Sequence, residues 1–135
     1  HGLQVIQHDE LKEINFGVLQ GRFRDDRDPK AQNLWAEREK AKETFRMPGG
    51  ETFDDLEARI DKCLSQILET AETILIVGHR STNRMILRRL MNWSINVAVS
   101  LKLRSKYVYE ISGNGISEIS TIQISNVVKC AGFVE

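Results

Sequence analysis

His79 stands at a position in the sequence where phosphate chemistry is possible. It follows the apolar run Thr73–Val77 through Gly78, and the residues after it can form a helix. In α/β sheets ligands bind at the carboxyl ends of strands, and a helix amino terminus offers free amides to an anion. The pattern therefore predicts an anion site at His79, with a histidine that merely closes a strand as the simpler alternative.

Positive charge is concentrated around this histidine. No acidic residue occurs between Glu72 and Glu110, whereas seven basic residues do: Arg80, Arg84, Arg88, Arg89, Lys102, Arg104 and Lys106. Such a local excess favours an anionic ligand. The alternative is a row of arginines on a solvated helix face, because Arg84 and Arg88 lie one turn apart.

Two glutamates are further candidates for chemistry. Glu13 lies in Leu11-Lys12-Glu13-Ile14 and by itself is typical of a surface acid. Glu51 directly precedes Thr52, and an acid at a helix start is favoured without any catalytic role. His1, His8 and His79 lack the local spacing of metal ligands, so no metal site is expected.

Composition limits the class of protein. The 135 residues are 41% hydrophobic and 28% charged, which fits one domain with a packed core. The zero net charge argues against a general attraction to nucleic acid or membrane, and no apolar run approaches the ~20 residues of a membrane span. Cys63 and Cys130 follow no disulfide or zinc pattern, so we expect reduced, packed thiols in a cytoplasmic protein.

Two helices are expected in the first half of the chain. Ala31–Arg46 predicts a solvated helix with Trp35 and Phe45 inward, ended by Met47–Gly50. Thr52-x-x-Asp55 is typical of a capping box at the start of the next helix. Its apolar positions recur at steps of three and four: Phe53, Leu56, Ile60, Cys63, Leu64, Ile67, Leu68 and Ala71.

The second half combines strands with one helix. Thr73–Val77 predicts a buried central strand, followed by a helix from Ser81 or Thr82 to about Asn92. Tyr107–Ile111 and Ile116–Ile124 predict a hairpin joined by Ser112-Gly113-Asn114-Gly115. With a short strand at 3–6 and a structured loop at 11–21, these elements predict an α/β domain.

Three segments, in order, resemble the histidine phosphatase, or phosphoglycerate mutase-like, superfamily. Leu11–Gly21 is similar to its L-x-E-I-x-F-G-x-x-x-G loop, and Pro48–Thr52 to its P-x-G-E-[ST] helix start. Ile76–His79, with Asn83 and Arg84, resembles the strand that ends in its second histidine. The resemblance covers nearly the whole chain and implies a three-layer α/β sandwich.

The resemblance also implies roles for individual residues. In the superfamily a first histidine, in an R-H-G motif, attacks phosphorus, and a glutamate protonates the departing alkoxide. Glu13 corresponds to this general acid and His79 to the second pocket histidine. Arg80, through its amide, Asn83 and Glu51 are candidate substrate-binding residues. The implied function is a phosphomonoester hydrolase or phosphotransferase acting on a small phosphorylated molecule, without cofactor or metal.

The R-H-G motif and a later phosphate-binding arginine are missing from the sequence. His1-Gly2 is a poor substitute, because only ten residues separate Gly2 from Glu13. We therefore expect residues 1–135 to be the carboxyl-terminal part of one domain that lacks its first strands and is inactive alone. An upstream segment, an associated chain or a second copy would then cover the edge of Thr73–Val77.

One alternative is a catalytically inactive phosphate-binding or interaction module of the same fold. Nucleic-acid binding is disfavoured because no aromatic side chains for base stacking are interleaved with the basic residues of Arg80–Arg89, near which Trp93 stands alone. The sequence does not distinguish a phosphatase from a mutase.

Overall fold

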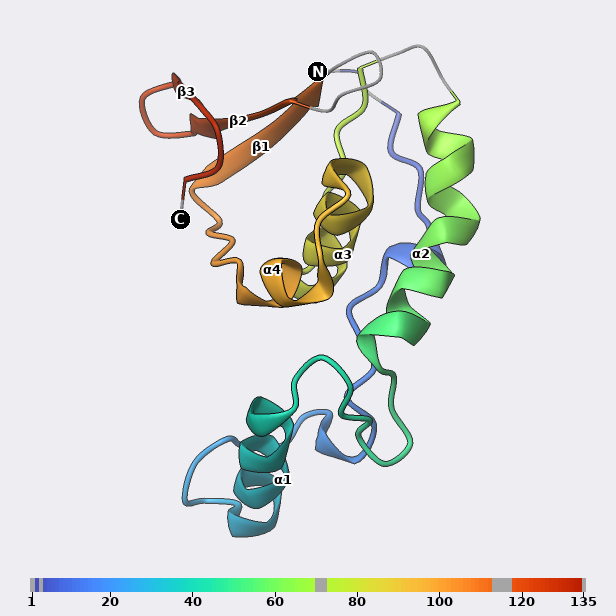
Figure 1. Cartoon of the computed structure of the whole chain (residues 1–135), viewed down its shortest axis with the longest axis vertical. Coiled ribbons are helices and arrows are strands. Elements are labelled where there is room, and N and C mark those ends of the chain that lie inside the picture. Colours follow the sequence, from blue (N-terminus) through green and yellow to red (C-terminus); the bar gives the residue numbers. More distant parts are fainter. Residues whose placement is uncertain (1, 3, 70–72, 113–117, 135) are drawn as a thin grey trace. The chain divides into compact units, whose positions relative to one another are not determined.

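The computed structural model describes residues 2, 4–69, 73–112 and 118–134. The chain divides into two compact units, His1–Ile86 and Leu87–Glu135. The elements follow in the order η1 (Asp9–Leu11), η2 (Gly17–Leu19), α1 (Pro29–Lys40), α2 (Phe53–Leu68), α3 (Arg80–Met91), α4 (Ile95–Ser100), β1 (Tyr107–Ser112), β2 (Glu118–Gln123) and β3 (Val128–Ala131) (Figure 1). This mixture of helices with a small antiparallel sheet is consistent with an α/β histidine phosphatase fold.

Helix α2 begins with the predicted capping box. The Thr52 hydroxyl oxygen accepts a hydrogen bond from the Asp55 amide at 3.2 Å, and the Asp55 carboxylate accepts one from the Thr52 amide at 2.8 Å. The Thr52 amide and hydroxyl both donate to the Asp55 carboxylate and, together with Arg46, lower the pKa of Asp55 to about 2. The helix buries the predicted apolar face at Phe53, Leu56, Ile60, Cys63 and Leu64, whereas Leu68 at its end is 52% exposed.

Helix α1 differs from its prediction at both ends. It begins at Pro29, where the Asp28 side chain caps the Ala31 amide at 3.2 Å, and it ends at Lys40 rather than Arg46. After Lys40 the chain forms a tight turn in which the Phe45 amide donates to the Ala41 carbonyl at 2.8 Å. Both expected anchors do point inward, since Trp35 and Phe45 join one apolar cluster with Phe16, Leu19, Ala31, Leu34 and Met47.

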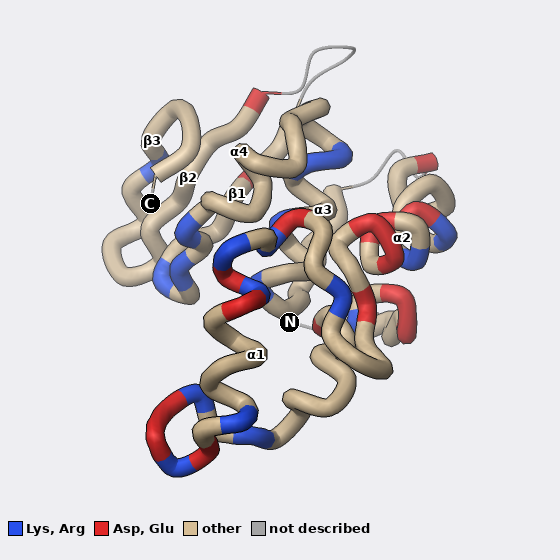
Figure 2. Tube along the Cα trace, turned by 60° about the horizontal axis from the view of Figure 1, so that its bottom comes forward, with Lys and Arg blue, Asp and Glu red and all other residues tan. Residues whose placement is uncertain are grey.

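Charged residues of both signs alternate in the loop before α1 (Figure 2). Arg22 pairs with Asp28 at 2.6 Å, and Arg27 pairs with Asp25. This loop therefore neutralises its own charges locally, close to the cap of α1.

The predicted central strand at Thr73–Val77 is wrong for the described chain. These residues are extended but join no sheet, and Leu75 and Val77 are 70% and 82% exposed. The expected strand near the start is likewise absent at residues 4–6, where Val5 is 83% exposed. A strand needs a neighbour to accept its hydrogen bonds, and no described residue supplies one to either segment.

In the second unit, β1, β2 and β3 form an antiparallel sheet in that order. The predicted hairpin is confirmed, with Tyr109 opposite Thr121. Residues 113–117 of its connection lie outside the described residues. Thr121 is 2% exposed and donates to the Gly132 carbonyl at 2.8 Å, which fixes the chain after β3. The sequence did not predict α4 or β3.

Two further findings bear on the class of protein. Cys63 is buried as expected, but Cys130 is exposed on β3, so its predicted packing is wrong. Among the described residues no helix is both long and apolar enough to cross a membrane. The described strands form a single three-stranded sheet, and the three-layer sandwich stays a prediction.

Candidate functional site

The loop that carries Glu13 packs directly against the Pro48–Thr52 turn, so two of the sequence motifs form one structural unit. Gly17 has φ +53, and a Cβ there would lie 2.1 Å from the Pro48 carbonyl oxygen. Only glycine permits this approach. The Val18 amide then donates to that same oxygen at 3.0 Å. The motif glycine is therefore explained by close backbone contact.

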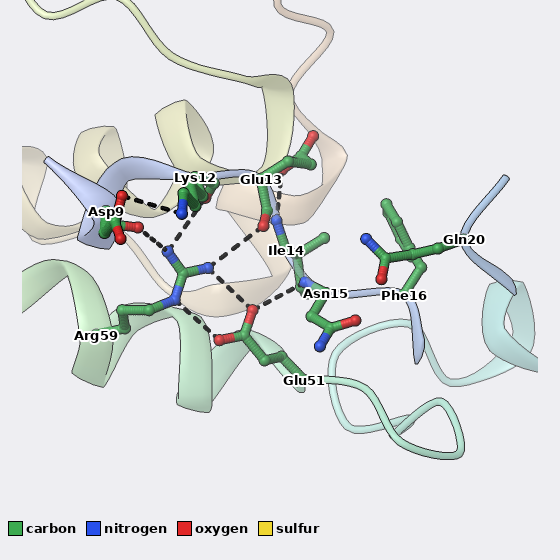
Figure 3. Close-up of a pocket in the computed structure, with 9 residues that line it drawn as sticks. All are labelled: Asp9, Lys12, Glu13, Ile14, Asn15, Phe16, Gln20, Glu51 and Arg59. Atoms are coloured by element: carbon green, nitrogen blue, oxygen red, sulfur yellow. Dashed lines mark hydrogen bonds and ion pairs between the residues drawn. The ribbon is translucent and has the colours of Figure 1, made fainter. Parts of the chain in front are cut away.

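Glu51 and Arg59 brace this loop from the side of α2 (Figure 3). The Arg59 guanidinium donates to both Glu51 carboxylate oxygens at 2.9 Å and to the Glu10 carbonyl at 2.7 Å. The second Glu51 oxygen also accepts from the Asn15 amide at 2.8 Å. Arg59, followed by the Asn15 contact, lowers the pKa of Glu51, which therefore remains an anion. This arrangement shows a bracing role for Glu51, and its role in substrate binding stays a prediction.

The Glu13 carboxylate lies at the amino terminus of α3. Its Oε1 accepts from the Ser81 amide at 3.2 Å and from its own neighbour, the Ile14 amide, at 2.9 Å. The Thr82 hydroxyl donates to the Lys12 carbonyl at 2.7 Å, which ties the loop to the same helix turn. The fold thus places Glu13 in contact with Ser81, two positions after His79, although 66 positions separate Glu13 from His79 in the sequence.

His79 is the residue immediately before α3. Its carbonyl accepts the Asn83 amide at 2.8 Å, and its side chain is exposed. The Asn83 side chain donates to the Gly78 carbonyl at 3.2 Å, so Asn83 fixes the turn that presents His79. Arg80 begins the helix and is exposed. Glu13, His79, Arg80 and Asn83 are therefore gathered at one helix end, while His1 lies outside the described residues.

Two buried arginines near Glu13 complete this group. Arg38 of α1 is 6% exposed and Arg84 of α3 is 8% exposed. Burial lowers the pKa of both guanidinium groups; Arg24 lowers that of Arg38 further, and Arg80 and Arg38 lower that of Arg84, while Glu13 opposes these effects. The solvated helix face considered for Arg84 is thus wrong. Cations crowded together in this way favour an anionic ligand.

Arg38 was missed by sequence reasoning, because α1 is so highly charged that no single arginine stands out. A usable signal exists: Arg38 lies three residues from Trp35, on the inward side of the helix. Its guanidinium lies 5.4 Å from the Phe16 ring centre and 5.5 Å from that of Phe53. Such aromatic contacts hold a buried cation in place.

A pocket of about 520 Å³ opens beside Glu13 (Figure 3). Its lining comes from the Glu13 loop and from the start of α2: Asp9, Lys12, Glu13, Ile14, Asn15, Phe16, Gln20, Glu51 and Arg59. The Glu51–Arg59 ion pair and the predicted general acid Glu13 therefore line the same pocket. His79 is not among its lining residues.

The family model of the histidine phosphatase superfamily (branch 1) matches residues 1–118. The chain therefore belongs to this superfamily. Its members are in general phosphatases and mutases, which supports a phosphatase-type enzyme at that level of detail.

Individual relatives are more distant. A bifunctional protein of Mycobacterium tuberculosis is 29% identical over 127 residues, covering 89% of this chain and 34% of that protein. A putative 6-phosphofructo-2-kinase/fructose-2,6-bisphosphatase of Saccharomyces cerevisiae is 27% identical over 126 residues, covering 93% of this chain and 24% of that protein. This chain thus spans only a quarter to a third of the relatives that it matches.

Proposed function

We propose that this chain provides the acid and phosphate-binding part of a phosphomonoester hydrolase or phosphotransferase that acts on a small phosphorylated molecule. A histidine nucleophile attacks phosphorus and forms phosphohistidine, while Glu13 gives a proton to the departing alkoxide oxygen. Water or an acceptor hydroxyl then takes the phosphoryl group. His79, the Arg80 amide and Asn83 line the phosphate pocket, and Glu51 holds the Glu13 loop beside the substrate.

The placement of Glu13 at the amino terminus of α3 carries this proposal. A helix start attracts anions through its amides and its partial positive charge. Arg84 and Arg38 add two buried cations beside it. A proton donor and an electrostatic clamp for phosphoryl oxygens are then adjacent, which is the arrangement that phosphate-ester cleavage requires.

The nucleophile in this proposal comes from an R-H-G segment, which these 135 residues do not contain. We propose that an extended strand carrying R-H-G pairs with Thr73–Val77, and that it is supplied by the same polypeptide, by an associated chain or by a second copy of the complete polypeptide. The exposed apolar side chains of Leu75 and Val77 support this pairing. We also propose a cytoplasmic location, because Cys63 and Cys130 are both unpaired.

The test of the proposed acid compares two substrates in the complete, active protein. Glu13→Gln should reduce turnover of an alkyl phosphate by about 100-fold, the usual contribution of general acid catalysis. It should affect a nitrophenyl phosphate much less, because that leaving group departs without a proton. His79→Ala should reduce turnover of both substrates by about 100-fold, since it removes charge stabilisation in either case.

Glu37→Gln serves as the control, because Glu37 is exposed on α1. Equal losses for both substrates in Glu13→Gln would refute the acid role, and near-normal rates in His79→Ala would refute the pocket role. Acid-labile phosphohistidine should form in the complete protein but not in residues 1–135 alone. Labelling of residues 1–135 alone would contradict the external origin of the nucleophile.

The alternative is an inactive phosphate-binding module, and the buried Arg38 and Arg84 support phosphate binding of this kind as well. It predicts binding of inorganic phosphate without turnover in the complete protein. Phosphohistidine formation separates the two functions, because a binding module forms none.

A further inference from the structure

Three side chains with metal-binding atoms converge where η1 meets α2, away from the helix end that presents His79. The ligand atoms of His8, Glu10 and Cys63 all lie within 4.8 Å of one another. His8 and Glu10 come from the start of the chain, whereas Cys63 comes from the middle of α2. The packing of η1 on α2 creates this cluster, and none of the three residues belongs to the motifs discussed above.

We propose that His8, Glu10 and Cys63 bind a zinc ion. Zinc takes cysteine sulfur, histidine nitrogen and carboxylate oxygen together, commonly as three protein ligands with water in the fourth position. Its bond lengths of about 2.0–2.3 Å place tetrahedral ligand atoms roughly 3.3–3.8 Å apart. The observed spacing therefore needs only small rotations of His8 and Glu10.

The three side chains differ in burial in a way that suits metal entry. Cys63 is 3% exposed and fixed in the α2 core, whereas the His8 and Glu10 side chains are 27% and 37% exposed. An ion can therefore reach the sulfur from the solvent side, and the two outer ligands can close over it. The His8 Nδ1 atom already lies 4.0 Å from a Glu10 carboxylate oxygen.

The charges of the cluster balance those of a divalent cation. A Cys63 thiolate and the Glu10 carboxylate carry two negative charges, and a neutral imidazole adds none. The Cys63 thiol donates to the Ile60 carbonyl at 3.3 Å. A coordinating thiol is deprotonated outright, so zinc binding would replace this hydrogen bond with a sulfur–metal bond.

Arg59 is a cation close enough to act on Cys63, and its positive charge would disfavour a bound metal ion. Its guanidinium donates to the Glu10 carbonyl, but both of its carboxylate bonds go to Glu51 at 2.9 Å. Its charge is therefore largely balanced before any metal binds. A bound ion would also fasten the segment just before Glu13 to α2, so zinc should stabilise the folded chain.

The spacing of the histidines gave no indication of this site, because His8 is the one histidine among its proposed ligands. The fold supplies the missing partners by placing Cys63 of α2 opposite Glu10 and His8, which lie three and five residues before Glu13. Only the tertiary structure makes the donor set visible.

The test uses cobalt as a spectroscopic substitute for zinc in the Cys130→Ser protein, since the exposed Cys130 thiol would bind metal nonspecifically. We expect one equivalent of cobalt to produce a sulfur-to-cobalt charge-transfer band and the visible bands of four-coordinate cobalt. Zinc should displace it. Changes that merely reorient a ligand cost about 10–100-fold in metal affinity, so His8→Gln and Glu10→Gln should each cost at least as much.

Cys63→Ser should abolish the charge-transfer band, but its buried position makes misfolding a risk. His8→Gln and Glu10→Gln keep the proposal testable, because both side chains are partly exposed and their folding can be checked by thermal unfolding without metal. The proposal is overturned if Cys130→Ser shows no charge-transfer band. It is equally overturned if His8→Gln and Glu10→Gln, correctly folded, bind cobalt as tightly as Cys130→Ser alone.

Discussion

The segment that carries Glu13 is held by contacts to two other parts of the chain, whereas the segment that leads to His79 is largely exposed among the described residues. Residues 11–21 contain no strand and only short 3-10 turns, yet Ile14 and Leu19 are 3% and 2% exposed. Residues 73–77 are far more β-prone, yet they lie extended with Leu75 70% exposed.

The difference shows that intrinsic propensity does not decide which segment becomes ordered. The Glu13 loop finds hydrogen-bond partners in the Pro48–Thr52 turn and in Arg59. The strand-like segment has suitable side chains but no neighbouring strand among the described residues. A buried strand needs a neighbouring strand for its backbone hydrogen bonds. Whether residues 73–77 form a strand therefore depends on their neighbours and not on their own β propensity.

The largest difference in stability is expected when one leucine is truncated in each of two regions, the core of α2 and the segment 73–77. Leu56→Ala should lower the free energy of unfolding by about 2–5 kcal/mol, because Leu56 is completely buried in α2. Leu75→Ala should change it by less than about 0.5 kcal/mol, as is usual for exposed positions. Urea unfolding of residues 1–135 measures both values.

The same two substitutions, Leu56→Ala and Leu75→Ala, also test whether the segment 73–77 is covered in the complete protein. If a strand covers Thr73–Val77 there, the loss caused by Leu75→Ala should rise toward that of Leu56→Ala. A large loss already in residues 1–135 would show that the segment is buried within this chain, contrary to the structure.

A second pair of substitutions tests the close backbone approach in the Glu13 loop. Gly17 and Gly21 both have positive φ, but only Gly17 faces backbone atoms that an added Cβ would strike. Gly21→Ala should cost about 1–2 kcal/mol from backbone strain alone. Gly17→Ala should cost about 1–3 kcal/mol more through overpacking. Equal losses of stability for Gly17→Ala and Gly21→Ala on thermal unfolding would show that the loop can move away from the added Cβ atom at little cost.

A smaller effect is expected at the α2 cap. Thr52→Ala removes the hydroxyl that accepts the Asp55 amide, and should cost about 1 kcal/mol. Thr73→Ala is the matched control, because Thr73 is exposed and lies in no helix or strand. Denaturant unfolding should show almost no change for this control. A comparable loss at both positions would remove the distinction between the regions.

The smallest effect is a loss of stability in acid. The pKa of Asp55 is lowered from 3.8 to about 2 by its capping bonds and Arg46, so the charged form stabilises the fold. This contribution is complete above about pH 4 and is lost as the pH falls toward 2. Unfolding of Asp55→Asn at several pH values should lack this component, whereas Asp54→Asn should retain it.

Sequence reasoning was accurate for features whose interacting residues are close together in the sequence, and less accurate for contacts between distant segments. The Thr52–Asp55 capping box, the α2 face and the β1–β2 pairing involve neighbours in the chain, and the structure confirms them. The end of α1 was misplaced because residues 41–45 form a turn that brings Phe45 back toward Trp35. Helix propensity alone could not show that packing Phe45 against this cluster is more favourable than continuing the helix beyond Lys40.

The candidate site divides in the same way. The motifs placed Glu13, His79, Arg80 and Asn83 on the segments that the structure brings to the start of α3, while their chemical roles stay predictions. Arg38 was missed, and Glu51 proved to brace the loop through Arg59, because both depend on contacts between distant segments.

By itself, the sequence determined the capping box that starts α2, the hairpin and the superfamily, because these rest on local hydrogen bonds and on motifs of fixed spacing. The tertiary structure alone decided that Gly17 touches the Pro48 turn, that Arg38 and Arg84 are buried beside Glu13, and that Thr73–Val77 stays uncovered. Each of these depends on which surfaces meet after folding, and burial changes the energy of a charge or an apolar side chain only once its neighbours are in place.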